Sequence, residues 1–430
     1  MHHATSPAIA PEPAPARVTS HSWRVIAAAS IGNALEWFDL VVYGFFAVTI
    51  ATLFFPAESD TVSLLMTLGT FGVSFFMRPL GAVVLGVYAD KAGRKAALTL
   101  SILLMMVGTL MIAVMPTYAS IGVLAPVGIV IARMIQGFSA GGEFGSATAF
   151  LAEHGASRRG FFSSWQASSQ GLTTVLAACF GAFLTSALTA EQMLDWGWRI
   201  PFFFGLLIGP VAFYIRRNID ETPEFLATET AQNPLSDTFS NQPERLLLAI
   251  GAVVVGTVAS YLILYMPTYA VKQLGIPPSA AFAATIATGV VQLIGAPIFG
   301  HWSDRVGRTG IMLGAALLFL VLAYPAYALL AAYPTFGMMI GVQLCIGAII
   351  SAYFGVLPAL LTELFPTATR TTGMSLGYNI AATLFGGFAP FIVTGLISVT
   401  GNPLAPSFYL SAAAAISVAT LLLIRQLGLR

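Results

Sequence analysis

Long apolar stretches alternate with short polar segments along almost the whole chain. A helix needs about 20 apolar residues to cross the hydrocarbon layer of a membrane, so each stretch predicts one transmembrane helix. The twelve predicted spans are 24–51, 61–88, 97–115, 121–145, 162–188, 199–216, 246–271, 279–301, 310–331, 335–361, 371–398 and 405–425. The pattern therefore predicts an all-α membrane protein.

Composition supports the bilayer as solvent, because 57% of the residues are hydrophobic and only 9% are charged, against about 25% charged in soluble domains. The net charge of +1 and the lack of a long basic run argue against a nucleic-acid partner. Cys179 and Cys345 each lie inside an apolar stretch, which argues against a disulfide or a metal site. We expect no cofactor.

A charged loop sequence occurs twice, in residues 86–95 and 300–309, and the two copies are 214 residues apart in a chain of 430. A second motif, an acidic residue followed by Arg, recurs 210 residues apart with Glu153 in the first copy and Glu363 with Arg370 in the second. Such duplication predicts two six-helix pseudo-symmetric bundles around a central cavity, the arrangement of alternating-access carriers.

The polar segments set the expected domain boundaries. We expect a disordered tail over 1–22, a first bundle over 23–217, a linker over 218–245, a second bundle over 246–425 and a short tail over 426–430. Fifteen of the 19 Lys and Arg residues fall on one side of the predicted spans. Because basic residues accumulate in cytoplasmic loops, this asymmetry predicts that both termini are cytoplasmic.

The duplicated loop resembles the loop motif of the major facilitator superfamily: Gly, three residues, Asp, a base, any residue, Gly and further bases. In that family the motif latches the two bundles together on the cytoplasmic side. The resemblance implies this role for Asp90 with Arg94 and for Asp304 with Arg308. Thr309 replaces the last base of the second copy, which predicts a weaker latch there. The other residues assigned to this cytoplasmic gate are Glu153, Glu363 and Arg370. Alternatively, the basic residues of these loops only set the orientation of the chain in the membrane.

Segments inside the spans resemble the metabolite:H+ symporter branch of that superfamily over nearly all of the chain after residue 22. They include 32–39, 76–81, 133–143 and 196–202. The resemblance implies proton-driven uptake of a small organic acid or zwitterion across a bacterial inner membrane. Residues 55–59 and 161–170 are most similar to citrate and tricarballylate carriers. Dicarboxylate, 2-oxoglutarate and shikimate carriers remain alternatives, as does a betaine or proline carrier.

Charged residues inside the spans are candidates for function, because a charge at the bilayer centre costs about 2.5–3.5 kcal/mol. Asp39 and Arg133 lie near the middle of spans one and four, and we expect them to face and satisfy each other across a cavity. Arg78 would join Arg133 in binding an anion, because guanidinium grips carboxylates with a fork of donors. Alternatively, Arg78 satisfies carbonyls freed by Pro79.

Proton coupling requires a carboxylate that exchanges its positive partner for a proton. If substrate competes for Arg133, Asp39 loses its partner and takes up a proton. Glu36 and Glu143 are further candidates for this role. Glu36 is alternatively a packing polar group, and Glu143 a gating or structural partner near the inner mouth.

Neutral polar residues complete the predicted substrate site. The spans of the second half contain no central charged residue, so there these neutral residues are the candidates. They are Gln136 in the first half and Tyr261, Gln292, Tyr378 and Asn379 in the second. Those of the second half alternatively bridge helices. No phosphate-binding loop of the P-loop form occurs, so the energy source is an ion gradient. H+ is expected, with Na+ left open, and we expect a monomer. An enzyme or a passive channel is disfavoured, because catalytic partners are lacking and an open pore needs no latch.

Overall fold

The computed structural model describes residues 20–428, apart from 93, 142, 156–157, 218–233 and 367–368. The described chain is predominantly helical and contains no strand. The first half consists of α1 (Ser20–Phe45), α2 (Ala47–Phe54), α3 (Asp60–Ala92), α4 (Arg94–Val114), α5 (Tyr118–Ile121), α6 (Leu124–Ala140), α7 (Glu143–His154), α8 (Arg159–Ala187), α9 (Ala190–Asp195), η2 (Gly197–Arg199) and α10 (Ile200–Arg217). The second half consists of α12 (Pro234–Asn241), α13 (Pro243–Leu274), α14 (Pro278–Val306), α15 (Arg308–Ala332), α16 (Phe336–Phe354), α17 (Leu357–Leu364), α18 (Arg370–Ala381), η3 (Ala382–Gly386), α19 (Ala389–Thr400) and α20 (Ala405–Gln426).

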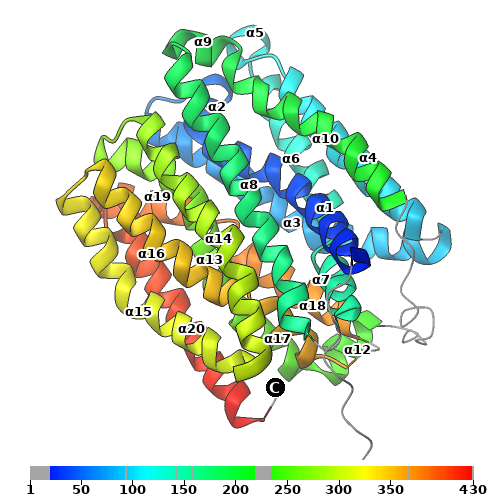
Figure 1. Cartoon of the computed structure of the whole chain (residues 1–430). Helices are drawn as coiled ribbons and strands as arrows, with labels where there is room; N and C mark the ends of the chain where they lie inside the picture. Colours follow the sequence, from blue (N-terminus) through cyan, green and yellow to red (C-terminus); the bar gives the residue numbers. More distant parts are fainter. Residues whose placement is uncertain are drawn as a thin grey trace, which may run out of the picture.

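Each predicted span corresponds to one helix or to a few consecutive short helices. Eight helical segments among the described residues are long and apolar enough to cross a membrane, and the bent pair α1 and α2 makes a ninth. Two of the eight combine consecutive elements, α16 with α17 and α18 with η3 and α19. The remaining spans are carried by shorter apolar helices, including α4 and α6. The predicted all-α membrane fold is confirmed. In Figure 1 the helices of the first half and those of the second half form two neighbouring groups.

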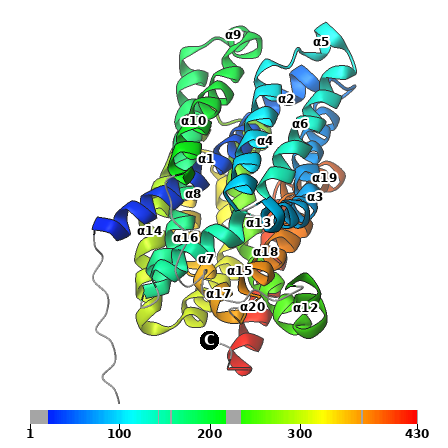
Figure 2. The same ribbon diagram turned by 90° about the vertical axis from the view of Figure 1, so that its right-hand side faces the viewer.

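The two ends of the molecule carry different elements. Figure 2 shows α5 and α9 at one end, with α12, α17 and the C-terminal part of α20 at the other. The predicted tail over 1–22 lies mostly outside the described residues, and α1 already begins at Ser20. Of the predicted linker over 218–245, the described part is largely helical, since α12 covers Pro234–Asn241 and α13 begins at Pro243.

The two bundles meet most closely along α8 and α14, which lie side by side in Figure 1. Two pairs of glycines bring the backbones together. A Cβ atom on Gly160 would lie 2.3 Å from the carbonyl oxygen of Gly300, and one on Gly289 would lie 2.9 Å from that of Gly171. The two glycines on each helix are 11 residues apart, as antiparallel packing in one continuous register requires. Small residues of this kind let membrane helices approach each other closely.

Several spans are interrupted, which the apolar pattern did not predict. The pair α1 and α2 is bent by 71°. The fourth span breaks between α6 and α7 beside Gly141, and the tenth breaks between α16 and α17 at Gly355. These two glycines are 214 residues apart, the same spacing as the duplicated loop. The repeat therefore extends to the places where helices break.

Candidate functional site

A narrow pocket lies among four helices of the first bundle. Its wall consists of Trp37, Asp39, Leu40, Ser74, Arg78, Met105, Arg133, Gln136, Gly137 and Ala140, contributed by α1, α3, α4 and α6. The pocket has room for about one water molecule only. The site is therefore closed around its own side chains in this arrangement.

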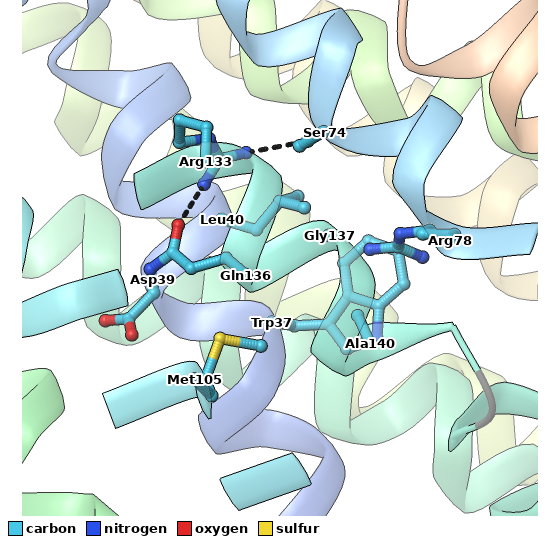
Figure 3. A pocket seen from close by; sticks show the side chains of 10 residues that line it. All are labelled: Trp37, Asp39, Leu40, Ser74, Arg78, Met105, Arg133, Gln136, Gly137 and Ala140. Carbon is cyan, nitrogen blue, oxygen red and sulfur yellow. Dashed lines mark hydrogen bonds between the residues drawn. The ribbon is translucent and has the colours of Figure 1, made fainter. Parts of the chain in front are cut away.

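Arg133 of α6 lies in this pocket with 1% of its surface exposed. One terminal nitrogen donates to Oε1 of Gln136 at 2.8 Å and the other donates to Oγ of Ser74 at 3.2 Å (Figure 3). The guanidinium carbon lies 4.6 Å from the ring centre of Tyr43 and 5.3 Å from that of Phe71. Two neutral partners and two aromatic faces thus hold this cation, and no carboxylate touches it among the described residues.

Asp39 of α1 has a different hydrogen-bond partner from those of Arg133. Its Oδ2 accepts from the hydroxyl of Thr109 on α4, and its Oδ1 has no hydrogen-bond partner among the described residues. Thr109 in turn accepts from Nε2 of Gln136 at 3.0 Å. A continuous path of hydrogen bonds therefore runs from Arg133 through Gln136 and Thr109 to Asp39.

The expected direct pairing of Asp39 with Arg133 is wrong for this arrangement. Within the described chain no ion pair joins them, and Gln136 lies between the two charges in Figure 3. The reason is geometric. Gln136 follows Arg133 by three residues on the same face of α6, and its amide offers an acceptor to one neighbour and a donor to the other.

Arg78 of α3 lies elsewhere in the same pocket, beside Gly137 and Ala140 in Figure 3. It is 4% exposed, and its guanidinium carbon lies 4.5 Å from the ring centre of Phe75 and 5.4 Å from that of Trp37. The described wall thus carries two guanidinium groups and one carboxylate. Its excess positive charge suits an anionic ligand.

The second bundle approaches the pocket through Tyr261 of α13. The ring of Tyr261 meets Phe75 edge-on at 5.1 Å between centres and lies 6.2 Å from Trp37. Tyr261 therefore packs behind the aromatic wall that holds Arg78. Gln292, on α14, is buried outside the pocket wall.

Tyr378 and Asn379 of α18 do not line the pocket either. The ring of Tyr378 stacks on Phe144 at 3.6 Å between centres, and Nδ2 of Asn379 donates to the carbonyl of Gly141 at 2.8 Å. Both contacts join the second bundle to the break between α6 and α7. These residues, predicted to bind substrate, form a junction between bundles here.

The second copy of the duplicated loop makes a contact between the bundles. The carboxylate of Asp304 accepts from the backbone N–H groups of Gly160 at 2.8 Å and Phe161 at 3.0 Å, at the N-terminus of α8. Arg308 pairs with Asp304 at 2.8 Å and with Glu363 at 3.2 Å. A carboxylate is favoured at this helix end by the helix dipole. On the same side, Arg370 donates to the carbonyl of Thr362 at 2.9 Å.

The side chains of several predicted site residues lie outside the described part of the structure. They are Glu36, Asp90, Arg94, Glu143 and Glu153. Conversely, Ser74 and Thr109 contact the two central charges but were not predicted from the sequence. The available signal was a hydroxyl inside an otherwise apolar span.

Comparison with known proteins agrees with this architecture. Residues 25–242 match the family described as "Sugar (and other) transporter", and residues 273–427 match "Major Facilitator Superfamily". The citrate-proton symporter of Klebsiella pneumoniae is 41% identical over 89% of this chain and 87% of the relative. The chain belongs to the major facilitator superfamily. Its predicted family membership is thereby confirmed, and its similarity is to transporters, not to enzymes.

Further relatives define the range of this resemblance. The citrate-proton symporter of Salmonella typhi is 37% identical, covering 93% of both chains. The proline/betaine transporter of Escherichia coli K12 is 35% identical, covering 92% of this chain and 82% of that relative. Among solved structures, the proton:xylose symporter XylE bound to 6-bromo-6-deoxy-D-glucose has a TM-score of 0.75 at 18% identity, covering 95% of this chain and 96% of XylE. That likeness shows the twelve-helix, two-bundle fold.

Proposed function

We propose that this superfamily member is a secondary transporter that takes up a small organic anion together with protons by alternating access. The observation that carries the proposal is the pair of buried guanidinium groups of Arg78 and Arg133, which share one pocket with Asp39, the one carboxylate among the described residues of its wall. Arg presents a planar fork that binds carboxylates with two parallel hydrogen bonds. A buried site with excess positive charge favours an anion over a neutral solute.

A di- or tricarboxylate such as citrate is the substrate class that fits best. Two guanidinium groups on different helices can each take one carboxylate of the same molecule, and the citrate-proton symporters at 41% and 37% identity support this choice. The alternatives are a shikimate-type acid, or betaine and proline, for which relatives at 35% identity are named. Betaine needs a site for a quaternary ammonium group, and here Arg78 already covers the faces of Trp37 and Phe75.

Coupling to protons follows from the path between the two central charges. A substrate carboxylate that binds Arg133 takes the place of Gln136, whose amide then stops linking Arg133 to Thr109. Asp39 loses its electrostatic connection to the cation and takes up a proton. Substrate and proton thereby occupy the carrier together. Gln136 is the exchangeable group in this scheme.

The gate residues and membrane orientation belong to the same proposal. The end of the molecule with Asp304, Arg308 and Glu363 would be cytoplasmic, with both chain termini on that side of a bacterial inner membrane. The contact of Asp304 with α8 would hold this end closed until the carrier releases substrate.

Radiolabelled uptake into proteoliposomes tests the proposal. Citrate, 2-oxoglutarate, shikimate and betaine are compared under an imposed pH gradient and without one. We expect gradient-dependent accumulation of a carboxylate, lost in Arg133→Ala. Selective accumulation of betaine, or carboxylate uptake that Arg133→Ala leaves intact, contradicts the proposed site. Replacing the pH gradient by a sodium gradient determines whether Na+ substitutes for H+.

A further inference from the structure

The hydroxyl of Thr109 lies between the two halves of the path from Arg133 to Asp39. We propose that Thr109 is the positioning residue that transmits the protonation state of Asp39 to Gln136 and Arg133. This inference rests on the proposed proton-coupled function and assigns its coupling to a residue on α4. The side chain meets no substrate in this scheme; it acts through Asp39 and Gln136.

The geometry around Thr109 gives its one hydroxyl hydrogen two acceptors. One is Oδ2 of Asp39, and the other is the carbonyl oxygen of Met105, one turn earlier on α4, at 3.0 Å. The oxygen of the same hydroxyl accepts from Nε2 of Gln136 at 3.0 Å. A hydroxyl has one donor and two acceptor positions, so it cannot donate to both neighbours at once.

The two acceptors match the two states of the carboxyl group. When Asp39 is ionised, the Thr109 hydrogen points to Oδ2. When Asp39 is protonated, its own O–H donates to the Thr109 oxygen, and the Thr109 hydrogen turns to the Met105 carbonyl. No proton leaves Thr109 in either state. Rotation about the C–O bond of Thr109 therefore switches its hydroxyl between the orientation that suits an ionised Asp39 and the one that suits a protonated Asp39.

This rotation alters the bond that Thr109 makes with Gln136. In the protonated state the Thr109 oxygen accepts from Asp39 and Gln136 together, while in the ionised state it accepts from Gln136 alone. The strength and direction of that bond set where the Gln136 amide lies, and Oε1 of the same amide holds Arg133. Neighbouring hydrogen bonds polarise one another in a medium of low dielectric.

No other described side chain provides this link. Arg133 of α6 and Arg78 of α3 are the charged groups in the pocket with Asp39. From α4 the neighbours are Met105 and Thr109, and from α10 the neighbour is Gly205, where a Cβ would lie 2.2 Å from Oδ1 of Asp39. Thr109 therefore makes the single hydrogen bond to the carboxyl group in the described structure.

Thr109→Val tests the proposal, because it removes the hydroxyl and keeps the branched shape. Thr109→Ser keeps the hydroxyl, and Thr109→Ala removes it in a smaller side chain. Reconstituted full-length variants are compared for citrate accumulation driven by a pH gradient, for citrate counterflow, and for uptake across a range of external pH. The double variant Asp39→Asn with Thr109→Val completes a cycle that isolates their coupling.

We expect gradient-driven accumulation to fall about tenfold in Thr109→Val, as the loss of one hydrogen bond to a charged group predicts, and counterflow to fall less. The alkaline limb of the pH profile moves to higher pH, because an ionised carboxylate without its donor is disfavoured. Thr109→Ser restores both properties. In the Asp39→Asn background, Thr109→Val changes the pH profile no further.

The proposal is overturned if Thr109→Val and Thr109→Ala both keep the wild-type pH profile and accumulate substrate normally. It is also overturned if counterflow and accumulation fall equally and Thr109→Ser does not restore them. Failure of the proposed function looks different. In that case the wild-type protein itself shows no gradient-dependent carboxylate uptake, and both proposals fall together.

Discussion

Arg133 uses both terminal nitrogens of its guanidinium on neutral side chains, Gln136 and Ser74. In the proposed scheme, a substrate carboxylate displaces at least one of these two partners and takes over its hydrogen bond to Arg133. Asp39 is a neighbour but not a partner of this cation. At the scale of residues, the central charges are thus separated by neutral side chains.

Arg133→Lys checks the need for a fork of donors. A lysine keeps the charge but cannot present two parallel N–H groups to one carboxylate. We expect the KM for carboxylate uptake to rise about tenfold or more, because hydrogen bonds to charged groups are worth about 1.5–3 kcal/mol. Uptake kinetics in proteoliposomes measure this. An unchanged KM means that Arg133 does not grip the substrate through its fork.

Gly205→Ala tests how closely Asp39 must be positioned. The added methyl would lie 2.2 Å from Oδ1 of Asp39, so the carboxyl group has to shift from its present position, in which it accepts from Thr109. We expect gradient-driven accumulation to fall severalfold while counterflow falls less. Gly209→Ala is the matched control on α10, because its methyl meets the flexible end of Met106 instead. Equal transport by both variants contradicts a close fit at Asp39.

Gly137 of α6 and Gly141, directly after its end, lie against the backbone of the α3 residues that form the site. A Cβ on Gly137 would lie 1.8 Å from the carbonyl oxygen of Ser74, and one on Gly141 would lie 2.0 Å from that of Arg78. Each pair advances by four residues along both helices, so the helices run parallel in a fixed register. At the scale of elements, this contact places Arg78 and Arg133 on adjoining backbones.

Gly137→Ala is therefore expected to force α3 and α6 apart. Overpacking of this kind costs about 1–3 kcal/mol, and it moves Ser74 away from Arg133. We expect a lower melting temperature of the purified protein and a higher KM for substrate. Gly341→Ala on α16 is the control, since its Cβ would meet nothing within 4 Å. If the melting temperature falls equally in both variants, the close packing of α3 against α6 is not the cause of the loss of stability.

The extent to which sequence predicts this structure depends on the element. The spans follow from apolar length, and the shared pocket of Asp39, Arg78 and Arg133 follows from the high cost of isolated charges in hydrocarbon. Thr109 was not predictable, because a hydroxyl in a membrane helix also bonds to its own backbone, as Thr109 does with Met105. The bend at Phe46 contains no proline, and its position depends on packing between helices.

Contacts between the bundles occur at both ends of the whole molecule. At one end Asp304 joins α8 and pairs with Arg308. At the other end Lys272 pairs with Asp60 at 2.9 Å, and the Asp60 side chain is 90% exposed. Exposed ion pairs contribute little to stability, so the contact at Asp304 is the stronger of the two. Of these two contacts, the one at Asp304 is therefore expected to hold the bundles together more firmly.

Asp304→Asn is expected to open that end. It removes the ion pair with Arg308 and weakens the charge at the start of α8. A cysteine introduced at Ser164, which is buried against Gly300, should then react several times faster with a maleimide, in a background lacking both native cysteines. Lys272→Gln is the control and should leave that rate unchanged. Equal rates in all variants show that Asp304 does not hold the end closed.

The break between α6 and α7 has a consequence for how the carrier admits solvent. The carbonyl of Gly141 at this break is covered by the amide of Asn379 from the other bundle. When the bundles separate there, that oxygen loses its donor inside a region where uncovered backbone groups are costly. Water has to arrive as Asn379 leaves, so wetting of the passage and parting of the bundles form one cooperative event.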